Sequence, residues 1–185
     1  MRPLLRLFAT AFALSFAVLS AGCAADAQTP SDEGTADSEL TSPNEKIAFD
    51  FFVGKGLTEI QAAAIVGNLQ QESGVNPASV QPGGPGRGIA QWSTGARWNH
   101  THGDNLASFA QSEGKSAGSL SVQLAFIWFE LENFDVYGLS ALKRATSINT
   151  ATLAFMRDFE ACGACNATHR ESYARAVLAA YGGAQ

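Results

Sequence analysis

The feature that most constrains this chain is a helical segment that must end beside a glycine-rich loop. Residues 59–72 carry apolar and small side chains at helical spacing, and the segment ends on Glu72. Pro77 cannot continue a helix, because it lacks a backbone N–H and its ring clashes with the preceding turn. Residues 77–88 hold three prolines and several glycines, which predicts a loop or a short irregular hairpin. The pattern therefore predicts one carboxyl group at a helix end, next to an open loop.

Start and stop signals predict further helices around this segment. Three pairs fit the capping box, in which two side chains satisfy free backbone N–H groups: Ser42 with Glu45, Thr58 with Gln61, and Thr168 with Glu171. The expected helices run from residue 42 to 54 or 56, and over 58–72, 94–112, 121–134, 150–160 and 169–181. No segment alternates long enough between apolar and polar residues to predict a strand. The expected fold is mainly α, with the loop or hairpin beside the helix of Glu72.

Residues 1–23 have the pattern of a signal peptide. Basic Arg2 and Arg6 precede an apolar run over 7–19, which is too short to cross a bilayer comfortably. Residues 19–23 resemble a lipobox ending at Cys23, although Ser20 stands where an aliphatic residue is more usual. A competing cleavage signal at residues 25–27 would discard Cys23. We expect export to the periplasm or cell surface, and favour a lipid anchor on a membrane over secretion.

The rest of the chain divides into a tether and one domain. Residues 24–43 are polar and acidic, a composition typical of a disordered tether. Residues 44–183 are numerous enough to bury a core without disulfides. The net charge is -5 and Lys and Arg form no cluster, which argues against a nucleic-acid partner. The charge also gives no attraction toward an anionic cell wall.

The motif around Glu72 resembles the phage tail lysozyme family of the lysozyme-like superfamily, which is related to lytic transglycosylases. Glu72-Ser73 at a helix end and Gly88-Ile89-Ala90-Gln91 downstream carry this resemblance, which extends from about residue 44 to 183. It implies a lysozyme-like domain that cleaves peptidoglycan glycan strands between N-acetylmuramic acid and N-acetylglucosamine. It also implies that Glu72 is the general acid and that Ser73 and Gln91 contact substrate. Without the motif, Glu72 would be interpreted as an ordinary solvated residue.

Two tryptophans are candidates for stacking on sugar rings. Aromatic faces commonly pack against the apolar side of pyranoses in sugar-binding clefts. Trp92 and Trp98 flank the glycine-rich loop, so both are expected to bind substrate. For Trp98, packing in the core is an equally good interpretation.

A second carboxylate is missing where many lysozymes carry one. No Asp or Glu occurs from residue 73 to 103, and the first acid afterwards is Asp104. The later acids are Glu113, Glu130, Asp135 and Glu160, and they are interpreted as surface charges or members of ion pairs. Glu130 is expected to pair with Arg157 or Arg144. Two endings of the reaction stay open: attack by the muramic acid's own hydroxyl, giving an anhydro product, or recruitment of Asp104. The sequence slightly favours the first.

The remaining signals concern cysteines and rival functions. In an exported protein, Cys162 and Cys165 are expected to form a disulfide. A zinc site with His169 would lack a fourth ligand, so no metal or cofactor is expected. A non-catalytic cell-wall-binding module remains an alternative because the second carboxylate is missing. A secreted lytic toxin is another, with the same chemistry but a different biology.

Overall fold

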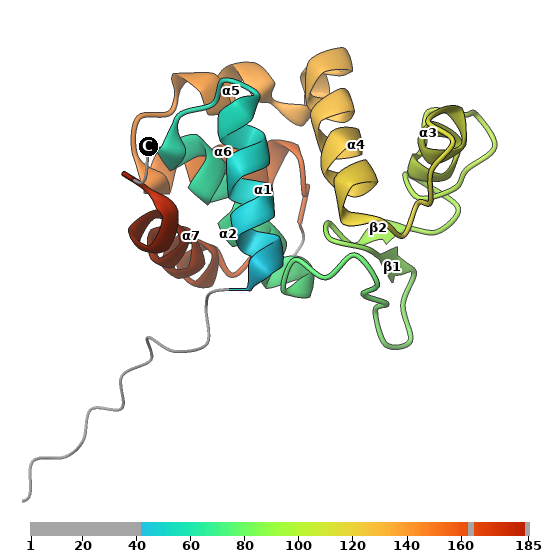
Figure 1. Cartoon of the computed structure of the whole chain (residues 1–185), viewed down its shortest axis with the longest axis horizontal. Helices are drawn as coiled ribbons and strands as arrows, with labels where there is room; N and C mark the ends of the chain where they lie inside the picture. Colours follow the sequence, from blue (N-terminus) through green and yellow to red (C-terminus); the bar gives the residue numbers. More distant parts are fainter. Residues whose placement is uncertain (1–41, 163–164, 184–185) are drawn as a thin grey trace, which may run out of the picture. The chain divides into compact units, whose positions relative to one another are not determined.

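The computed structural model describes residues 42–162 and 165–183, which form one mainly helical unit (Figure 1). The described part contains seven α-helices, one 3-10 helix and two short strands. Their bounds are α1 Pro43–Gly54, α2 Glu59–Ser73, β1 Gly86–Arg87, β2 Trp92–Ser93, α3 Leu106–Ser112, α4 Leu120–Asn133, η1 Asp135–Tyr137, α5 Leu139–Arg144, α6 Ile148–Asp158 and α7 Ala167–Tyr181. The mainly α prediction is confirmed. The predicted signal peptide, the lipidation site Cys23 and nearly all of the tether lie outside the described residues.

Helix α2 lies at the centre of the unit. Every residue from Gln61 to Leu69 is buried, because α1, α6 and α7 all pack against this helix. The contact with α7 is very close: a Cβ added at Gly67 would lie 2.5 Å from the backbone nitrogen of Ala174. Only glycine lets the two backbones approach this far. The tight contact fixes the position of α7 relative to the end of α2, where Glu72 lies.

Capping chemistry explains where the first two helices begin and end. Ser42 with Glu45 and Thr58 with Gln61 form the two predicted capping boxes. Helix α2 ends at Ser73, and Gly74 follows with a φ of 65°, a left-handed conformation that favours glycine. The third predicted capping box is wrong. Helix α7 already begins at Ala167, so Thr168 lies inside its first turn and cannot cap it.

The loop after α2 forms a short hairpin that is held by a buried glutamine. Strands β1 and β2 pair in antiparallel fashion. Gln123 on α4 accepts a hydrogen bond from the Ile89 backbone N–H and donates to the carbonyls of Pro77 and Ala117. Gly88 has a φ of 70°, and a Cβ there would lie 2.6 Å from the Gln123 Oε1. These contacts fix the loop beside the end of α2.

Two helix predictions differ from the structure. The helix predicted over residues 94–112 is reduced to α3, because residues 94–104 form turns in which Gly95 and Gly103 have φ values of 77° and 90°. Helix α5 has no counterpart in the prediction. It is only six residues long, too short to produce a readable helical period.

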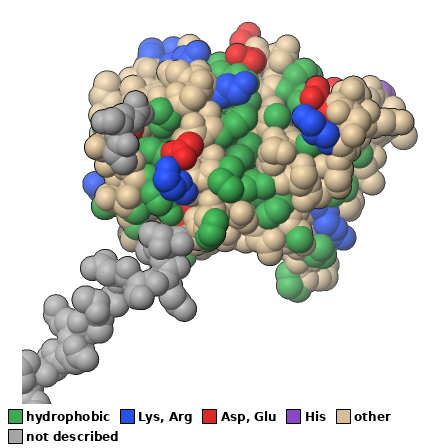
Figure 2. Space-filling view, in the orientation of Figure 1, with side chains coloured by type: hydrophobic (Ala, Val, Ile, Leu, Met, Phe, Trp, Pro, Cys, Tyr) green, Lys and Arg blue, Asp and Glu red, His purple; other side chains and the backbone are tan. Residues whose placement is uncertain are grey.

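The outer face of the unit is mixed in character. On the face shown in Figure 2, hydrophobic side chains form a band over the region where α1 and α4 face each other, and acidic and basic side chains lie beside one another, as in the exposed pair of Lys46 and Asp50. Within the described ranges, no helix combines the length and apolar character needed to cross a membrane.

Candidate active site

A cavity of about 620 Å³ lies between the end of α2, the hairpin and the segment after α6. Two carboxyl groups line it, those of Glu72 and Glu160. The other lining residues are Ser79, Val80, Gln81, Pro82, Ala90, Gln91, Trp92, Ser93, Ala96, Arg97 and Cys162. The predicted site residues Glu72, Gln91 and Trp92 therefore meet at one cavity. The sequence did not place Glu160 there.

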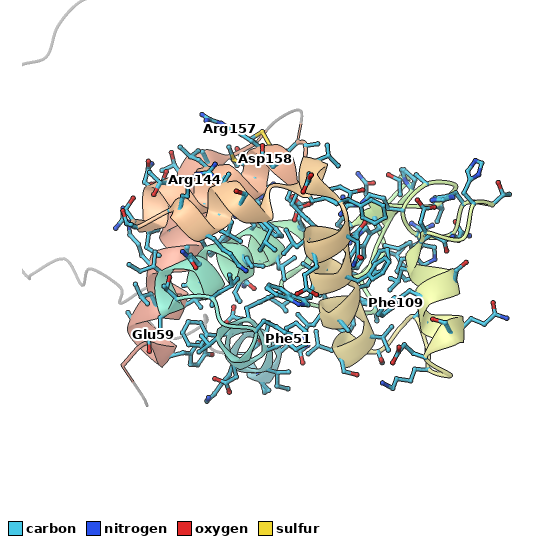
Figure 3. The ribbon with its side chains drawn as sticks, turned by 90° about the horizontal axis from the view of Figure 1, so that it is seen from above. Phe51, Glu59, Phe109, Arg144, Arg157 and Asp158 are labelled. Atoms are coloured by element: carbon cyan, nitrogen blue, oxygen red, sulfur yellow. A yellow bond between two sulfur atoms is a disulfide. The ribbon has the colours of Figure 1, made fainter. Side chains whose placement is uncertain are left out.

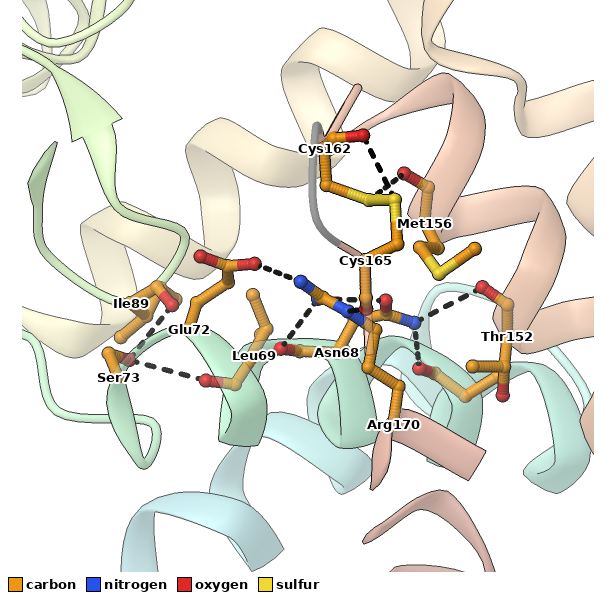
Figure 4. A network of polar contacts seen from close by, with 11 residues as sticks. Asn68, Leu69, Glu72, Ser73, Ile89, Thr152, Met156, Cys162, Cys165 and Arg170 are labelled. Carbon is orange, nitrogen blue, oxygen red and sulfur yellow. Dashed lines mark hydrogen bonds and ion pairs between the residues drawn. A yellow bond between two sulfur atoms is a disulfide. The ribbon is translucent and has the colours of Figure 1, made fainter. Parts of the chain in front are cut away.

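Glu72 forms an ion pair with a buried arginine. Its Oε1 accepts a hydrogen bond from an Nη of Arg170 on α7, and the two side chains point toward each other (Figure 4). The Glu72 side chain keeps 20% of its surface exposed, whereas Arg170 keeps 3%. The guanidinium therefore compensates the charge of Glu72 on the protein side, and the carboxylate still faces the cavity.

Arg170 is fixed by several acceptors besides Glu72. Its Nε donates to the carbonyl of Cys165, and its Nη1 donates to the backbone oxygen and to the Oδ1 of Asn68. The Asn68 amide in turn donates to the carbonyls of Ala64 and Thr152. A planar guanidinium suits such a fixed set of acceptors. Helices α2, α6 and α7 are thus tied together directly behind Glu72.

Glu160 enters the cavity from the segment that follows α6. The residue as a whole is partly exposed, but its Oε1 is buried and has no hydrogen-bond partner among the described residues. Burial raises the pKa of Glu160 to about 8, and the charge of Glu72 adds to this rise, while Arg97 and Arg170 oppose it. Loss of hydration and a like charge both disfavour an ionised carboxyl group. Glu160 therefore holds its proton at neutral pH.

The end of α6 is held by Arg97. Its Nη1 donates to the carbonyl of Phe159, the residue just before Glu160. Its Nε and Nη2 bind both carboxylate oxygens of Glu130 at 2.6 and 2.7 Å. Its guanidinium also lies over the ring of Phe159, 4.3 Å from the centroid. Arg97 thereby connects the hairpin region, α4 and the segment that carries Glu160.

The expected partner of Glu130 was wrong. Glu130 pairs with Arg97 and accepts a hydrogen bond from Trp92 Nε1 at 3.1 Å. Arg144 and Arg157 instead lie on α5 and α6 with exposed side chains (Figure 3). Burial raises the pKa of Glu130, although its bonds to Arg97 and Trp92 oppose the rise. Its role in holding the scaffold fits the prediction, with a different arginine.

Gln91 and Ser73 are engaged with the backbone around the cavity. Gln91 lines the cavity, and its amide donates to Ser79 Oγ and to the carbonyl of Gly88. Ser73 is absent from the residues that line the cavity in the described structure. Its hydroxyl donates to the carbonyl of Ile89 at 2.9 Å and so joins the end of α2 to the loop. Gln91 therefore lies where it can contact a ligand in the cavity, as predicted. Ser73 does not line the cavity, and its hydroxyl holds the loop instead.

Of the remaining predicted residues, Trp92 lies at this cavity, whereas Trp98 and Asp104 do not line it. Trp92 lines it but is only 2% exposed, so its ring is a wall of the cavity rather than an open stacking face. Trp98 is partly buried and packs against the core. Asp104 pairs with His100 at 2.9 Å and lines a different cavity, together with Phe109 and Phe129. The structure therefore does not bring Asp104 to Glu72.

A disulfide joins Cys162 to Cys165, as expected from the sequence. It lies between Glu160 and Arg170 in the chain, and Cys162 lines the cavity. Ala161 and Asn166, on either side of it, have φ values of 46° and 44°, which are unfavourable for residues with a side chain. The bridge constrains Cys165, and with it the carbonyl that Arg170 binds.

Among residues 42–162 and 165–183, no group of three or more His, Cys, Asp or Glu side chains is placed to hold a metal ion. A comparison with curated proteins found no match. The family model described as phage tail lysozyme matches residues 43–181, most of the chain. This match covers the whole helical unit and the cavity with Glu72, and it agrees with the lysozyme-like fold expected from the motif. The chain therefore belongs to the phage tail lysozyme family.

Proposed function

We propose that the protein is an exported peptidoglycan hydrolase that cleaves the bond between N-acetylmuramic acid and N-acetylglucosamine. Membership of the phage tail lysozyme family indicates peptidoglycan lysis by a glycosidase. The observation that carries the finer proposal is that Glu72 and Glu160 line the same cavity. Glycoside hydrolysis commonly uses two carboxyl groups on either side of the scissile bond. Export rests on the signal-peptide pattern of residues 1–23.

The walls of the cavity suit a polar, chain-like ligand. Hydroxyl and amide side chains line it at Ser79, Gln81, Gln91 and Ser93, and these groups can bind sugar hydroxyls and acetamido groups. Val80 is 58% exposed and offers an apolar surface at the rim. A few placed polar groups with apolar contacts are typical of small-ligand and sugar sites.

Hydrolysis is preferred over the anhydro-forming route because a second carboxylate is present. The sequence favours the intramolecular route only because it contains no acid near the Glu72 motif. Glu160, from 88 positions further along the chain, supplies that acid at the cavity. One carboxyl group can then protonate the leaving oxygen while the other, as a carboxylate, stabilises the sugar cation or activates water.

The test is to digest purified peptidoglycan and to weigh the released muropeptides. We expect products with reducing ends, whereas an anhydro product would weigh one water less. Glu72→Gln should lower the rate by about 10²-fold or more, the usual scale for a lost acid or base. Glu132→Gln, at an exposed position on α4, is the matched control and should retain the parent rate. Anhydro products alone, or full activity of Glu72→Gln, would contradict the proposal.

A cell-wall-binding module without catalysis remains a second candidate. The observation that favours it is the ion pair between Glu72 and Arg170, which engages the carboxyl group that catalysis would need. This candidate predicts retention of the protein on insoluble peptidoglycan without release of muropeptides. The toxin alternative shares the chemistry, so the same digestion supports it equally.

A further inference from the structure

We infer that Arg97 is a positioning residue of the reaction, which places Glu160 relative to the hairpin wall of the cavity at Trp92. This inference rests on the proposed glycosidase function, in which Glu160 supplies the second carboxyl group. Arg97 lines the cavity, but its three guanidinium nitrogens already donate to Glu130 and to the carbonyl of Phe159. It therefore acts through the groups that it holds.

The position of Glu160 depends on the end of α6. The buried Oε1 of Glu160 has no hydrogen-bond partner among the described residues, so the backbone that carries the side chain has to place it. The last carbonyls of a helix lack partners within the helix. Arg97 Nη1 binds the carbonyl of Phe159, which directly follows α6, at 3.0 Å. A cation is also favourable at the C-terminal end of a helix, so Arg97 fixes the chain one position before Glu160.

The hairpin wall is bound to the same guanidinium through Glu130. Trp92 Nε1 donates to Glu130 Oε2 at 3.1 Å, and Arg97 Nη2 donates to the same oxygen at 2.7 Å. Arg97 Nε binds the other carboxylate oxygen at 2.6 Å. Glu130 lies on α4 and is only 1% exposed. Two parallel bonds between a guanidinium and a carboxylate have a defined geometry, so Trp92, Glu130 and Arg97 form one fixed unit.

This unit connects walls that come from distant parts of the chain. The bonds that Arg97 and Trp92 make to α6 and α4 cross 62 and 38 positions. Glu72 is held separately, by Arg170 on α7. Loss of the Arg97 contacts should therefore move Glu160 relative to Glu72. A misplacement of about 1 Å at a reacting centre can cost about 10²-fold in rate, so the loss should appear in catalysis rather than in binding.

A positioning role can be separated from an effect of charge alone. The charged groups around Glu160 are Glu72 on α2, Glu130 on α4, Arg170 on α7 and Arg97 itself. Arg97→Lys keeps the charge but cannot make the same set of bonds. A role through charge alone would leave the pKa of Glu160 unchanged. A positioning role lets water reach the carboxyl group, so the pKa should fall from about 8 toward the ordinary 4.5.

The experiment compares Arg97→Lys with the parent protein and with Arg175→Lys, a control on α7 with a 64% exposed side chain. On solubilised glycan strands, Arg97→Lys should lower kcat by about 10²-fold. KM should change little, because Gln81 and Gln91 still line the cavity. Carbon-13 NMR of labelled glutamate carboxyl groups should show Glu160 titrating at lower pH in Arg97→Lys only.

A second variant keeps the test decisive if Arg97→Lys does not fold. Removing both charges of a buried ion pair is often neutral for stability, whereas removing one is costly. The double variant Arg97→Gln, Glu130→Gln should therefore fold, and it should show the same loss of kcat and a lower pKa of Glu160. Charge alone predicts a higher pKa of Glu160 in this variant, because Arg97 affects it more than Glu130 does.

The inference is overturned by a kcat equal to that of the parent, or by an unchanged or raised pKa of Glu160, in either variant that folds. The NMR titration requires no catalysis. Absence of muropeptide release by the parent protein would therefore contradict the proposed function, while the titration still decides whether Arg97 positions Glu160.

Discussion

Among single residues, Glu160 makes the stability of the fold depend on pH, because its carboxyl group is buried beside the cavity. In an unfolded chain its carboxyl group ionises near its ordinary pKa of 4.5, whereas in the folded protein burial raises that pKa to about 8. Between these values the folded state binds the extra proton, so the free energy of unfolding falls as the pH rises. Glu160→Gln removes this titration. The variant should be more stable than the parent by about 4 kcal/mol at pH 8.

Urea denaturation of both proteins at pH 4.5 and pH 8 measures this difference. The gap between variant and parent should be small at pH 4.5 and should open as the pH rises. Glu132→Gln, on the exposed side of α4, should follow the parent at both values. A gap that stays constant with pH would mean that Glu160 is not held protonated in the fold.

Arg170 is the residue on which the geometry behind Glu72 depends. Lysine keeps the positive charge but cannot bind Glu72, Asn68 and Cys165 at the same time. Arg170→Lys should therefore lower the free energy of unfolding by about 1–3 kcal/mol, the scale for leaving a buried acceptor without its hydrogen bond. It should also lower the rate of peptidoglycan cleavage. Arg175→Lys, on the same helix with a 64% exposed side chain, is the control; equal losses in the two variants would contradict the role of Arg170.

At the scale of secondary-structure elements, the contact between α2 and α7 places Arg170 behind Glu72. A methyl group at Gly67 would meet the backbone of Ala174 and the Arg170 carbonyl at 2.5 and 2.7 Å. Gly67→Ala must push the helices apart, and overpacking of this kind typically costs about 1–3 kcal/mol. Gly54→Ala is the matched control, because nothing lies within 4 Å of a Cβ there. Thermal unfolding should show a lower midpoint for Gly67→Ala only; a parent-like midpoint would contradict the close packing.

Local signals predicted the elements that depend on neighbouring residues. The capping boxes at Ser42 and Thr58 bind groups three positions away, so the sequence contains both partners side by side. The end of α2 follows in the same way from Gly74 and Pro77. The start of α7 was mispredicted because Asn166 begins the helix without a side-chain hydrogen bond. A helix that begins without such a bond leaves no capping pattern to recognise.

The sequence predicted only those site residues that lie close together in the chain. Glu72 and Gln91 lie within one motif, and the structure brings both to the cavity. Glu160 and Arg170 come from the other end of the chain, where the sequence offers only a charge after a helix and a charge within one. Their burial depends on contacts across 98 positions, such as that between Arg170 and Glu72. One local hint existed: Glu160 stands directly before the cysteine pair, so a disulfide constrains its segment.

At the scale of the whole molecule, the net charge of -5 means that long-range attraction does not bring the protein to an anionic cell wall. We propose that an anchor, rather than charge, keeps the protein near the wall. The pattern at residues 19–23 offers the anchor, on a cysteine outside the described residues. A chain from residue 23 to residue 42 spans at most ~65 Å when fully extended. Such an anchor would keep residue 42, where the folded unit begins, within that distance of the membrane.

The state of the mature N-terminus tests this proposal. In a bacterial host that lipidates proteins, we expect a mass spectrum with a diacylated or triacylated Cys23 and a protein that remains with the membrane fraction. Cys23→Ser should move the protein to the soluble fraction and leave its rate on purified, solubilised glycan strands unchanged, because the described unit contains the whole cavity. A mature chain that begins at Gln28 would support export but contradict the anchor. A chain that still begins at Met1 would contradict export as well, since the segment over residues 7–19 would then have been neither recognised nor removed.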